Sequence, residues 1–455
     1  MPTAYTILFL LLILVAAATW IIPAGSYDYV DGVPVAGTYH PVEQNPQGVG
    51  DVLKAAFSGF YDAVDVCVFI LMVGGFLGVV MKTGAIDAGV SNVIALLGGR
   101  EKWLIPILML FFGLGGTTYG MWEETMAFYP LLIPVFLAAG YDAVVGISVI
   151  LLGAGAGVIA STVNPFATGI AAGFAGVSLG EGIVLRLLEW VAFEAAAIWF
   201  VMAYAAKVKK NPSKSVVGVG AGKIQVSMDQ QVPFTAKRKV IMALFTLTFL
   251  IMVYAVVPFD EMGLPLPTLG WWFPELSALF LVAGVVIGLI DRMSEEELVE
   301  IYVAGCADLL GVAFIIGISR GITVLMNDGA ITDTVLHWGE QALSGAGAIS
   351  FTLLVFALYL PLTILIPSSS GLATLSIPIV APLGKFAGVG GDLVVTAFQS
   401  ASGLVNIITP TAAVVMGALA LGHVPYDRWV KYVWKLILWF LLLALAFLVA
   451  GVLLG

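Results

Sequence analysis

Long apolar runs alternate along this chain with short polar segments, and several runs have the length of a membrane-spanning helix. Residues 6–22, 241–257 and 436–454 contain no charged side chain. An α-helix needs about 20 such residues to cross the hydrocarbon core of a bilayer. The first run is long and no small-residue cleavage site clearly ends it, so we expect the first transmembrane helix here rather than a cleaved signal peptide.

Four short segments rich in glycine, serine, threonine and asparagine interrupt the apolar pattern. Residues 103–114, before the first segment, are too few to span a bilayer alone, which predicts a hairpin with its tip near 115–125. A second hairpin, from the opposite side, is predicted with its tip near 367–374. The segments near 161–169 and 400–411 carry Asn-Pro and Thr-Pro within long apolar stretches, and they predict broken helices because proline removes a backbone donor. In chain order the four segments read GGTTYGMWEET, STVNPFATG, PSSSGLAT and SASGLVNIITPT.

Parts of the first half of the chain return in the second half. Residues 69–86 and 314–331 share Phe-Ile, then Val-x-Met, then Gly-Ala-Ile, at a constant separation of 245 residues. Pro130 and Pro378 each begin a Pro-x-x-x-Pro, 248 residues apart, and a Val-Asn pair recurs in the two broken-helix segments at 242 residues. Two related halves around a site near the membrane midplane are typical of secondary transporters.

The composition also indicates a membrane protein. Hydrophobic residues make up 60% of the 455 residues and charged residues only 11%, against roughly 25% charged residues in soluble domains. The mean hydropathy is +1.06. We therefore expect an all-α polytopic membrane protein with about 9–11 transmembrane segments in the cell (cytoplasmic) membrane.

The positions of lysine and arginine predict the orientation, because cytoplasmic loops are enriched in both. With a cytoplasmic N-terminus, the predicted outer segments near 25–52, 258–274 and 327–347 contain neither residue. The same topology places most of the 19 Lys and Arg residues on the inner side. The four exceptions are Lys54, Arg186, Arg320 and Lys385.

This topology divides the chain into two halves of opposite orientation. We expect a first inverted repeat over residues 1–207, a cytoplasmic linker without a further role over 208–236, and a second inverted repeat over 237–455. In the second repeat, Ser294 followed by three glutamates predicts a helix N-cap with an acidic first turn.

The polar segments supply the side chains that we expect to bind a substrate. Lipid cannot satisfy the carbonyls freed by a helix break, so such breaks are tolerated where protein or a water-filled cavity covers them. Freed carbonyls, hydroxyls and asparagine amides are good ligands for Na⁺ or a polar substrate, and helix N-termini attract carboxylates. The predicted substrate-binding residues are Thr117, Thr118, Glu123, Glu124, Asn164, Ser368, Ser369, Ser370, Asn406, Thr409 and Arg320. The candidate Na⁺ ligands are Asn164, Asn406, Thr162 and Thr411.

Two sets of charged residues in the predicted membrane region suggest ligand groups. Glu123 and Glu124 at the first hairpin tip would complement a cation, a proton or a cationic substrate group, because two carboxylates there are costly without partners. Arg320 could grip a substrate carboxylate through two hydrogen bonds. Glu194 and Asp308 are candidate partners of Arg320 or proton carriers.

Arg186 and Glu189 lie three residues apart on one predicted helix face. Oppositely charged side chains at this spacing are neighbours on a helix surface. We therefore expect them to form a pair at the membrane interface.

Other function classes find little support in the sequence. The net charge of −10 and the basic inner loops argue against a nucleic-acid partner. His40, His337 and His423 fall in predicted loops without a metal-binding cluster, there is no phosphate-binding loop, and Ser370 has no nucleophile-elbow context. We expect no enzyme and no cofactor beyond Na⁺ or H⁺ coupling. An ion channel is a less favoured alternative to a carrier, because opposed hairpins also occur in pores.

The polar segments carry a family resemblance. Residues 115–125, 160–169 and 369–373, with the early WIIPAG of residues 20–25, resemble the YfcC family, over essentially the whole chain. That family belongs with the DcuC-like C4-dicarboxylate carriers and the ArcD-type basic amino-acid antiporters in the ion transporter superfamily. The resemblance implies two inverted repeats, each with a re-entrant hairpin and a broken helix. It also implies a homodimer in membrane lipid whose scaffold helices hold two transport domains that move the substrate by an elevator-like shift.

Two substrate classes remain open. A dianion needs at least two cationic groups, and the chain offers only Arg320 and helix dipoles, so an amino acid with a cationic side chain is favoured, in an arginine/ornithine-type exchange. Its α-carboxylate would meet the helix N-terminus at residues 368–370 and its cationic group would meet Glu123 and Glu124. The alternative is a Na⁺- or H⁺-coupled carrier of a C4-dicarboxylate, with the loops of Asn164 and Asn406 holding Na⁺ near the carboxylates.

Overall fold

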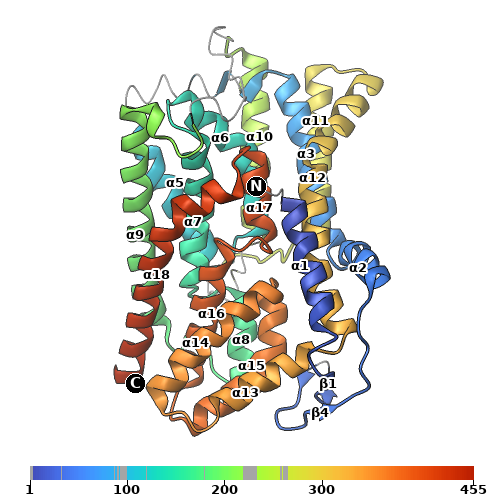
Figure 1. Cartoon of the computed structure of the whole chain (residues 1–455). Helices are drawn as coiled ribbons and strands as arrows, with labels where there is room; N and C mark the ends of the chain where they lie inside the picture. The colour runs from blue at the N-terminus through green and yellow to red at the C-terminus, as the bar shows by residue number, and fades with distance from the viewer. Residues whose placement is uncertain are drawn as a thin grey trace.

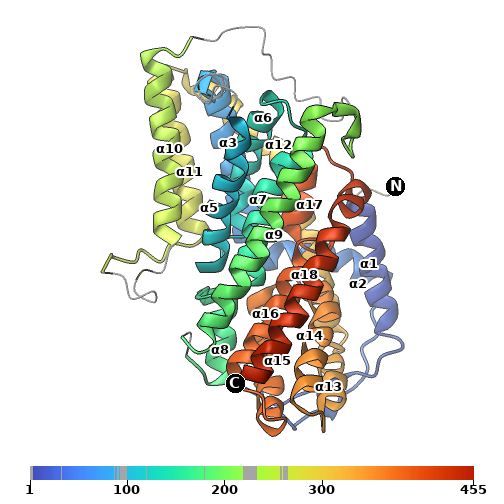
Figure 2. The same ribbon diagram turned by 90° about the vertical axis from the view of Figure 1, so that its left-hand side faces the viewer.

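α-Helices form nearly all of the fold (Figures 1 and 2). The computed structural model describes residues 4–31, 33–86, 88–89, 92, 100–118, 120–178, 180–218, 233–256, 259 and 265–454. The elements up to residue 214 are α1 (Ala4–Ala18), β1 (Gly25–Ser26), β2 (Tyr29–Val30), β3 (Val33–Pro34), β4 (His40–Pro41), α2 (Val49–Asp62), α3 (Val64–Lys82), η1 (Glu101–Trp103), α5 (Leu104–Thr118), η2 (Glu123–Phe128), α6 (Tyr129–Ala138), α7 (Ala143–Ile159), η3 (Pro165–Gly169), α8 (Ile170–Ala175), α9 (Ile183–Lys210) and η4 (Pro212–Lys214). The later elements are α10 (Ala236–Val256), α11 (Phe273–Asp291), α12 (Glu295–Asp328), α13 (Thr332–Leu343), α14 (Ala348–Leu365), α15 (Ser369–Phe386), α16 (Gly391–Asn406), α17 (Ala413–Leu421) and α18 (Tyr426–Leu454).

Five helices of the described chain are long and apolar enough to cross a membrane: α3, α11, α12, α14 and α18. Two apolar helices are shorter, Tyr5–Ala18 and Ala143–Ile159. The second of these, α7, is followed after a break by η3 and α8, and α16 is followed after a break by α17. Half-length helices therefore replace single long ones where the sequence predicts breaks. The predicted all-α membrane fold class is confirmed.

The two repeated stretches begin and end at matching positions. α12 begins 246 residues after α2 begins, and it ends 246 residues after α3 ends. Ala63 (φ −120°, ψ 22°) separates α2 from α3, whereas α12 is one helix of 34 residues. Ser294 caps α12 by accepting a hydrogen bond from the Glu297 backbone N–H (3.2 Å), which confirms the predicted N-cap.

α12 packs against both α2 and α3 through close glycine contacts. Gly59 of α2 lies against Gly317, and Gly74 of α3 lies against Gly305. Lys82, the last residue of α3, forms an ion pair with Glu297 in the first turn of α12 (3.7 Å). Later positions of the first copy thus meet earlier positions of the second, so the copies are antiparallel. This is the relative direction expected of inverted repeats.

The ends of α3, α9 and α11 and the start of α10, which carry or adjoin basic residues predicted to be cytoplasmic, lie at one end of the molecule, at the top of Figure 1. There Lys237 pairs with Asp291 (2.6 Å), and the Arg238 Nε donates to the Thr83 carbonyl (3.1 Å). The predicted linker begins later than expected, because α9 continues to Lys210. Its first part contacts the helices: the Ser215 hydroxyl donates to the Asp142 carboxylate (2.6 Å). The rest of the predicted linker, residues 219–232, lies outside the described residues.

At the opposite end, the described residues of 25–47 form a segment, here called the strap, that lies on α13. It contains two antiparallel strand pairs, β1 with β4 and β2 with β3, which the sequence did not predict because each strand has two residues. The Tyr27 backbone N–H donates to Asp333 (3.0 Å) and its hydroxyl donates to Glu340 (2.8 Å). The prediction that His337 lies in a loop is wrong: it belongs to α13 and stacks on Tyr39, with ring centroids 4.0 Å apart.

Candidate functional site

The first helix break is held by the end of α5. The Thr117 hydroxyl donates to the Ala160 carbonyl (2.7 Å), and the Thr117 carbonyl accepts from the Thr162 hydroxyl (2.9 Å). Both threonines are buried. Their oxygens therefore tie the end of α5 to the break.

Asn164 lies directly over Gly120, in the segment predicted to form the first hairpin tip. Gly120 has a positive φ of 78°, and a Cβ added there would lie 2.5 Å from the Asn164 Nδ2. Only glycine leaves room for this amide. The Asn164 Oδ1 accepts from the Ala167 N–H (3.3 Å) at the start of the next helical segment. Thr118 stands apart, because its hydroxyl donates to Leu114 within its own helix (2.6 Å).

The segment predicted to form the second hairpin tip contains a capped helix N-terminus. Ser368 is the N-cap of α15, and its hydroxyl accepts from the Gly371 backbone N–H (3.2 Å). Ser369 and Ser370 form the first turn and are half-buried. The positive end of the α15 dipole is therefore located at this tip.

The second break begins later than the sequence suggests. The predicted segment started at residue 400, but α16 is helical through Asn406, and the chain leaves the helix at residues 407–412. The hydroxyls of Thr409 and Thr411 lie 2.9 Å apart, and the Ser319 hydroxyl of α12 donates to the Thr411 carbonyl. The Asn406 Oδ1 is buried without a hydrogen-bond partner in the described structure.

A central cavity of about 30 Å³ lies where these elements meet. Glu123 of the first tip, Arg320 of α12 and Thr411 of the second break line it, so it combines one acidic side chain, one basic side chain and a threonine. Its volume is about that of one water molecule, and a larger ligand requires the elements to move apart. The lining residues are Val66, Trp122, Glu123, Ile316, Ser319, Arg320, Pro367, Thr411, Ala412, Ala413 and Val414.

The two adjacent glutamates of the first tip have different surroundings. Glu124 is 5% exposed and does not line the cavity. Its carboxylate accepts from the Trp122 backbone N–H (3.1 Å) and so caps the turn that carries Glu123. Of the residues predicted to bind substrate, Glu123 and Arg320 line the cavity together, and Pro367 brings the Ser368–Ser370 tip next to it.

Arg320 is paired with a residue that the sequence did not single out. Its Nε lies 3.9 Å from the Asp62 carboxylate at the end of α2. The expected partners Glu194 and Asp308 are elsewhere, on α9 and in a second cavity. Asp62 is placed by the interruption at Ala63, which the apolar pattern did not reveal.

Arg186 and Glu189 are both buried, with side chains 1% and 0% exposed. Protein atoms therefore cover both side chains, and the depth of the pair in the membrane stays a prediction. Glu189 accepts a hydrogen bond from the Ser400 hydroxyl of α16 (2.8 Å). A helix-surface argument could not foresee this contact, because Ser400 lies on a different helix, α16.

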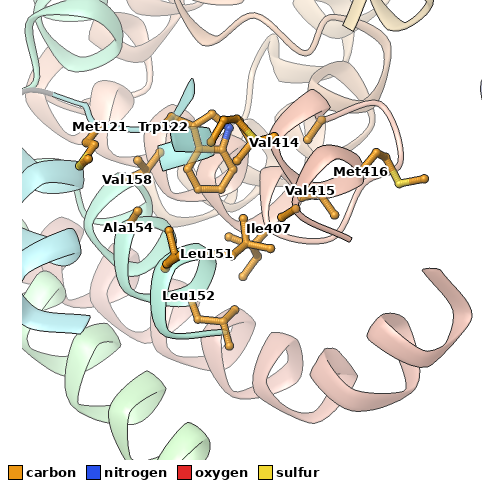
Figure 3. Packing of buried hydrophobic residues seen from close by; sticks show 14 of the residues in the cluster. Met121, Trp122, Leu151, Leu152, Ala154, Val158, Ile407, Val414, Val415 and Met416 are labelled. Atoms are coloured by element: carbon orange, nitrogen blue, oxygen red, sulfur yellow. The ribbon is translucent and has the colours of Figure 1, made fainter. Parts of the chain in front are cut away.

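Apolar side chains from both breaks pack beside the central cavity (Figure 3). Trp122 of the first tip and Val414 after the second break belong to this cluster, together with Leu151 of α7. A Cβ added to Gly155 would lie 2.4 Å from the Ile407 Cγ2, so α7 and the second break are in direct contact.

A larger cavity of about 1020 Å³, here called the vestibule, opens between α3 and α12 on one side and α6, α17 and the start of α18 on the other. Asp308, His423 and Arg428 contribute its ionisable groups, with Tyr5, Tyr426 and Asp427. It reaches Val312 and Ile315 on α12, and the central cavity continues at Ile316. The two cavities are thus neighbours along one helix.

Sequence comparisons identify relatives along the whole chain. The family profile described as "DcuC: C4-dicarboxylate anaerobic carrier" matches residues 1–453. A Haemophilus influenzae protein of uncharacterised function is 35% identical, with 99% of this chain and 97% of that protein covered. An Escherichia coli protein named "Putative basic amino acid antiporter YfcC" is 30% identical, with 95% and 92% covered.

Two solved structures are similar over nearly the whole chain. The YdaH transporter of Alcanivorax borkumensis has a TM-score of 0.44 at 14% identity and covers 98% of both chains. MtrF of Neisseria gonorrhoeae, described among antimetabolite efflux pumps, has a TM-score of 0.42 at 18% identity and covers 98% of this chain and 94% of its own. The family match over the whole length, together with the identity to YfcC, shows that this chain belongs to the DcuC family and is a membrane transporter of the DcuC/YfcC type.

Proposed function

We propose that this protein is a secondary active transporter that exchanges amino acids with cationic side chains across the cytoplasmic membrane. The observation that carries the proposal is the central cavity, where Glu123 and Arg320 face one space beside the N-terminal end of α15. Arg320 and the helix N-terminus would hold the α-carboxylate. Glu123 would meet the ammonium or guanidinium group. The name of the Escherichia coli relative points to the same substrate class.

A second candidate is Na⁺- or H⁺-coupled transport of a C4-dicarboxylate. Arg320 and the α15 N-terminus provide two positive groups beside the cavity, and the matching family is named for such a carrier. In this reading Glu123 is protonated or structural, and Asn164 and Asn406 hold Na⁺. The unpartnered Asn406 Oδ1 supports a cation there, because a buried oxygen without a partner is costly.

For both substrates we propose elevator-like alternating access by a homodimer with a cytoplasmic N-terminus. The small central cavity supports movement, because an amino acid does not fit into about 30 Å³. The vestibule supports access from the end that carries the basic segments, since it includes Met81 next to Lys82 and also Arg428. The first hairpin would move with the first broken helix, to which the contacts of Thr117 and Asn164 tie it.

Thermal-shift measurements on the purified protein test the substrate class. Arginine, ornithine, lysine, succinate and fumarate are added separately, with and without Na⁺, because a ligand that binds only the folded state raises the melting temperature. The basic amino acids are expected to stabilise. Stabilisation by succinate or fumarate instead, particularly with Na⁺, would reverse the choice of substrate.

Counterflow in proteoliposomes then tests the carrier mechanism. Vesicles loaded with unlabelled arginine should take up labelled arginine transiently and saturably. Flux that neither saturates nor shows counterflow would contradict a carrier and indicate a channel.

A further inference from the structure

Two buried carboxyl groups on α9 take no part in the central cavity. Glu189 and Glu194 are 0% and 2% exposed, and Glu194 lies eleven residues into a helix of 28 residues. α9 packs against α5, α7 and α18 (Figure 2). Glu194 is therefore far from both helix ends, where a charged side chain could reach water.

Glu194 has no polar partner in the described structure. Neither of its carboxyl oxygens takes part in a hydrogen bond. The group lies against Gly113 of α5, where an added Cβ would be 2.5 Å from the Oε2 and 2.8 Å from the Cδ. Because this glycine lets the helix backbone approach the carboxyl so closely, the group is enclosed by packed atoms.

Ionisable groups on the neighbouring elements lie away from Glu194. The described residues of α5 and α7 include none. Those of α18 fall within its first ten residues, whereas Phe193, beside Glu194, contacts Phe440 further along. η4 carries Lys214 beyond the end of α9. On α9 itself the ionisable residues besides Glu194 are Arg186, Glu189, Tyr204, Lys207, Lys209 and Lys210.

An ionised carboxylate in such surroundings is very unfavourable, and the group is neutralised instead. A metal ion or a cationic substrate would need space and further ligands, and neither the central cavity nor the vestibule includes Glu194. Binding of a proton requires no additional space and no further ligands. We propose that Glu194 is a proton-binding site that couples proton movement to transport, an inference that rests on the proposed carrier function.

The contacts of α9 show how a charge on Glu194 would reach the substrate site. Gly113 lies one helical turn before Thr117, which holds the first break. On another face of α9, Glu189 accepts from Ser400 of α16, the helix that ends at Asn406 and the second break. Loss of the Glu194 proton leaves a carboxylate that must reach water, which requires α5 and α9 to separate. The protonated acid permits the close packing seen here.

Infrared spectroscopy tests the protonation directly, without a substrate. The reconstituted wild-type protein at neutral pH should show the carbonyl stretch of a protonated carboxylic acid, and Glu194→Gln should remove part of that band. Glu296→Gln, at an exposed position in the first turn of α12, is the matched control and should leave the band unchanged. Glu194→Met serves as a second variant if the glutamine variant does not fold, because an apolar side chain of similar size suits an apolar site.

Proteoliposome transport tests the coupling, with labelled arginine and labelled succinate as probes. One coupled proton should give about tenfold accumulation per unit of imposed pH gradient, because a tenfold ratio corresponds to about 1.4 kcal/mol. In the Glu194 variants this accumulation should be lost while counterflow of the same probe persists.

Two results would overturn the proposal. One is an infrared band of equal intensity in the wild type and both Glu194 variants. The other is gradient-driven accumulation that survives in a variant. Failure of the proposed carrier function would give a different result, because the wild type would then exchange neither arginine nor succinate. The infrared comparison would still decide whether Glu194 binds a proton.

Discussion

Glu123 and Glu124 are neighbours in the sequence but perform different tasks in the structure. The backbone of η2 turns Glu123 toward Arg320 across the central cavity and turns Glu124 back onto the Trp122 N–H. The sequence placed both acidic residues among the predicted substrate-binding side chains. It could not separate the two, because their surroundings depend on how the chain enters η2 at Trp122.

This difference predicts opposite behaviour of two matched variants. Glu123→Gln should weaken arginine binding by about 10- to 100-fold, because a charge-assisted hydrogen bond contributes about 1.5–3 kcal/mol. Glu124→Gln should lower the melting temperature with a smaller effect on binding. Titration calorimetry and thermal melts of both purified variants provide the comparison. Unchanged arginine affinity in Glu123→Gln, or tighter succinate binding, would support the dicarboxylate reading.

At the scale of elements, the crossing of α2 and α3 over α12 depends on glycine. Gly59 permits backbone contact with Gly317, and Gly74 permits contact with Gly305. Small residues at helix crossings are typical of membrane proteins, where close packing replaces the hydrophobic effect between helices. The repeat in the sequence predicted that the two stretches are related, but it did not predict that they pack on each other.

Two alanine substitutions within α2 test this crossing. A Cβ at Gly59 would lie 2.1 Å from the Gly317 carbonyl oxygen, so Gly59→Ala should destabilise the protein by about 1–3 kcal/mol or more through overpacking. Gly50 lies in the same helix, and a Cβ added there would meet no atom within 4 Å. Gly50→Ala should therefore leave the free energy of unfolding unchanged or raise it by up to about 1 kcal/mol. Melting temperatures in detergent measure both. Equal effects of the two substitutions would contradict the close contact.

The two helix breaks were predicted from the local sequence, but the start of the second was not placed correctly. Proline and polar residues located both broken helices, because a lost backbone hydrogen bond is a local property. The starting point of the second break was placed too early, since Ser400–Asn406 is as polar as a loop but remains helical against α7 and α14. Burial by neighbouring helices decided that boundary.

At the scale of the whole molecule, the strap joins the chain before α2 to α13. Burial is the largest cause that raises the pKa of Tyr27, and the hydrogen bond to Glu340 raises this pKa further. Burial, followed by the hydrogen bond to Asp333, raises the pKa of Tyr29. The folded state therefore favours both protonated phenols. Their contribution to stability is complete below the unfolded tyrosine pKa of about 10 and is lost as the pH rises through the folded values.

We therefore expect the melting temperature of the wild type to fall above about pH 10. The double variant Tyr27→Phe/Tyr29→Phe should be less stable at neutral pH and should show a shallower alkaline decrease. Tyr61→Phe, at an exposed position in α2, is the control and should follow the wild type. Parallel alkaline curves for the wild type and the double variant would show that the strap contacts do not carry this pH dependence.

The proposed orientation leads to a labelling prediction for the whole molecule. With a cytoplasmic N-terminus, Glu43→Cys in the strap should react with a membrane-impermeant maleimide in intact cells. Lys214→Cys in η4 should react only after permeabilisation. Both positions are exposed, and the wild type with its buried Cys67 and half-buried Cys306 gives the background. The reverse pattern would invert the topology.

The sequence by itself determined the features that depend on composition and local chemistry. These are the membrane-embedded helical class, the repeated stretches, the two breaks and the residue types at the tips. Apolar periodicity, proline and the distribution of basic residues act over a few turns of chain, so a single sequence reveals them.

Only the tertiary structure decided which polar groups meet. Asp62 rather than Glu194 or Asp308 pairs with Arg320, and Glu189 accepts a hydrogen bond from Ser400 of α16. Within the described residues, the Glu194 carboxyl has no hydrogen-bond partner and lies against Gly113. Each contact joins residues from different helices. Helix packing sets such contacts by small shifts and rotations of whole elements, and one-dimensional spacing does not encode them.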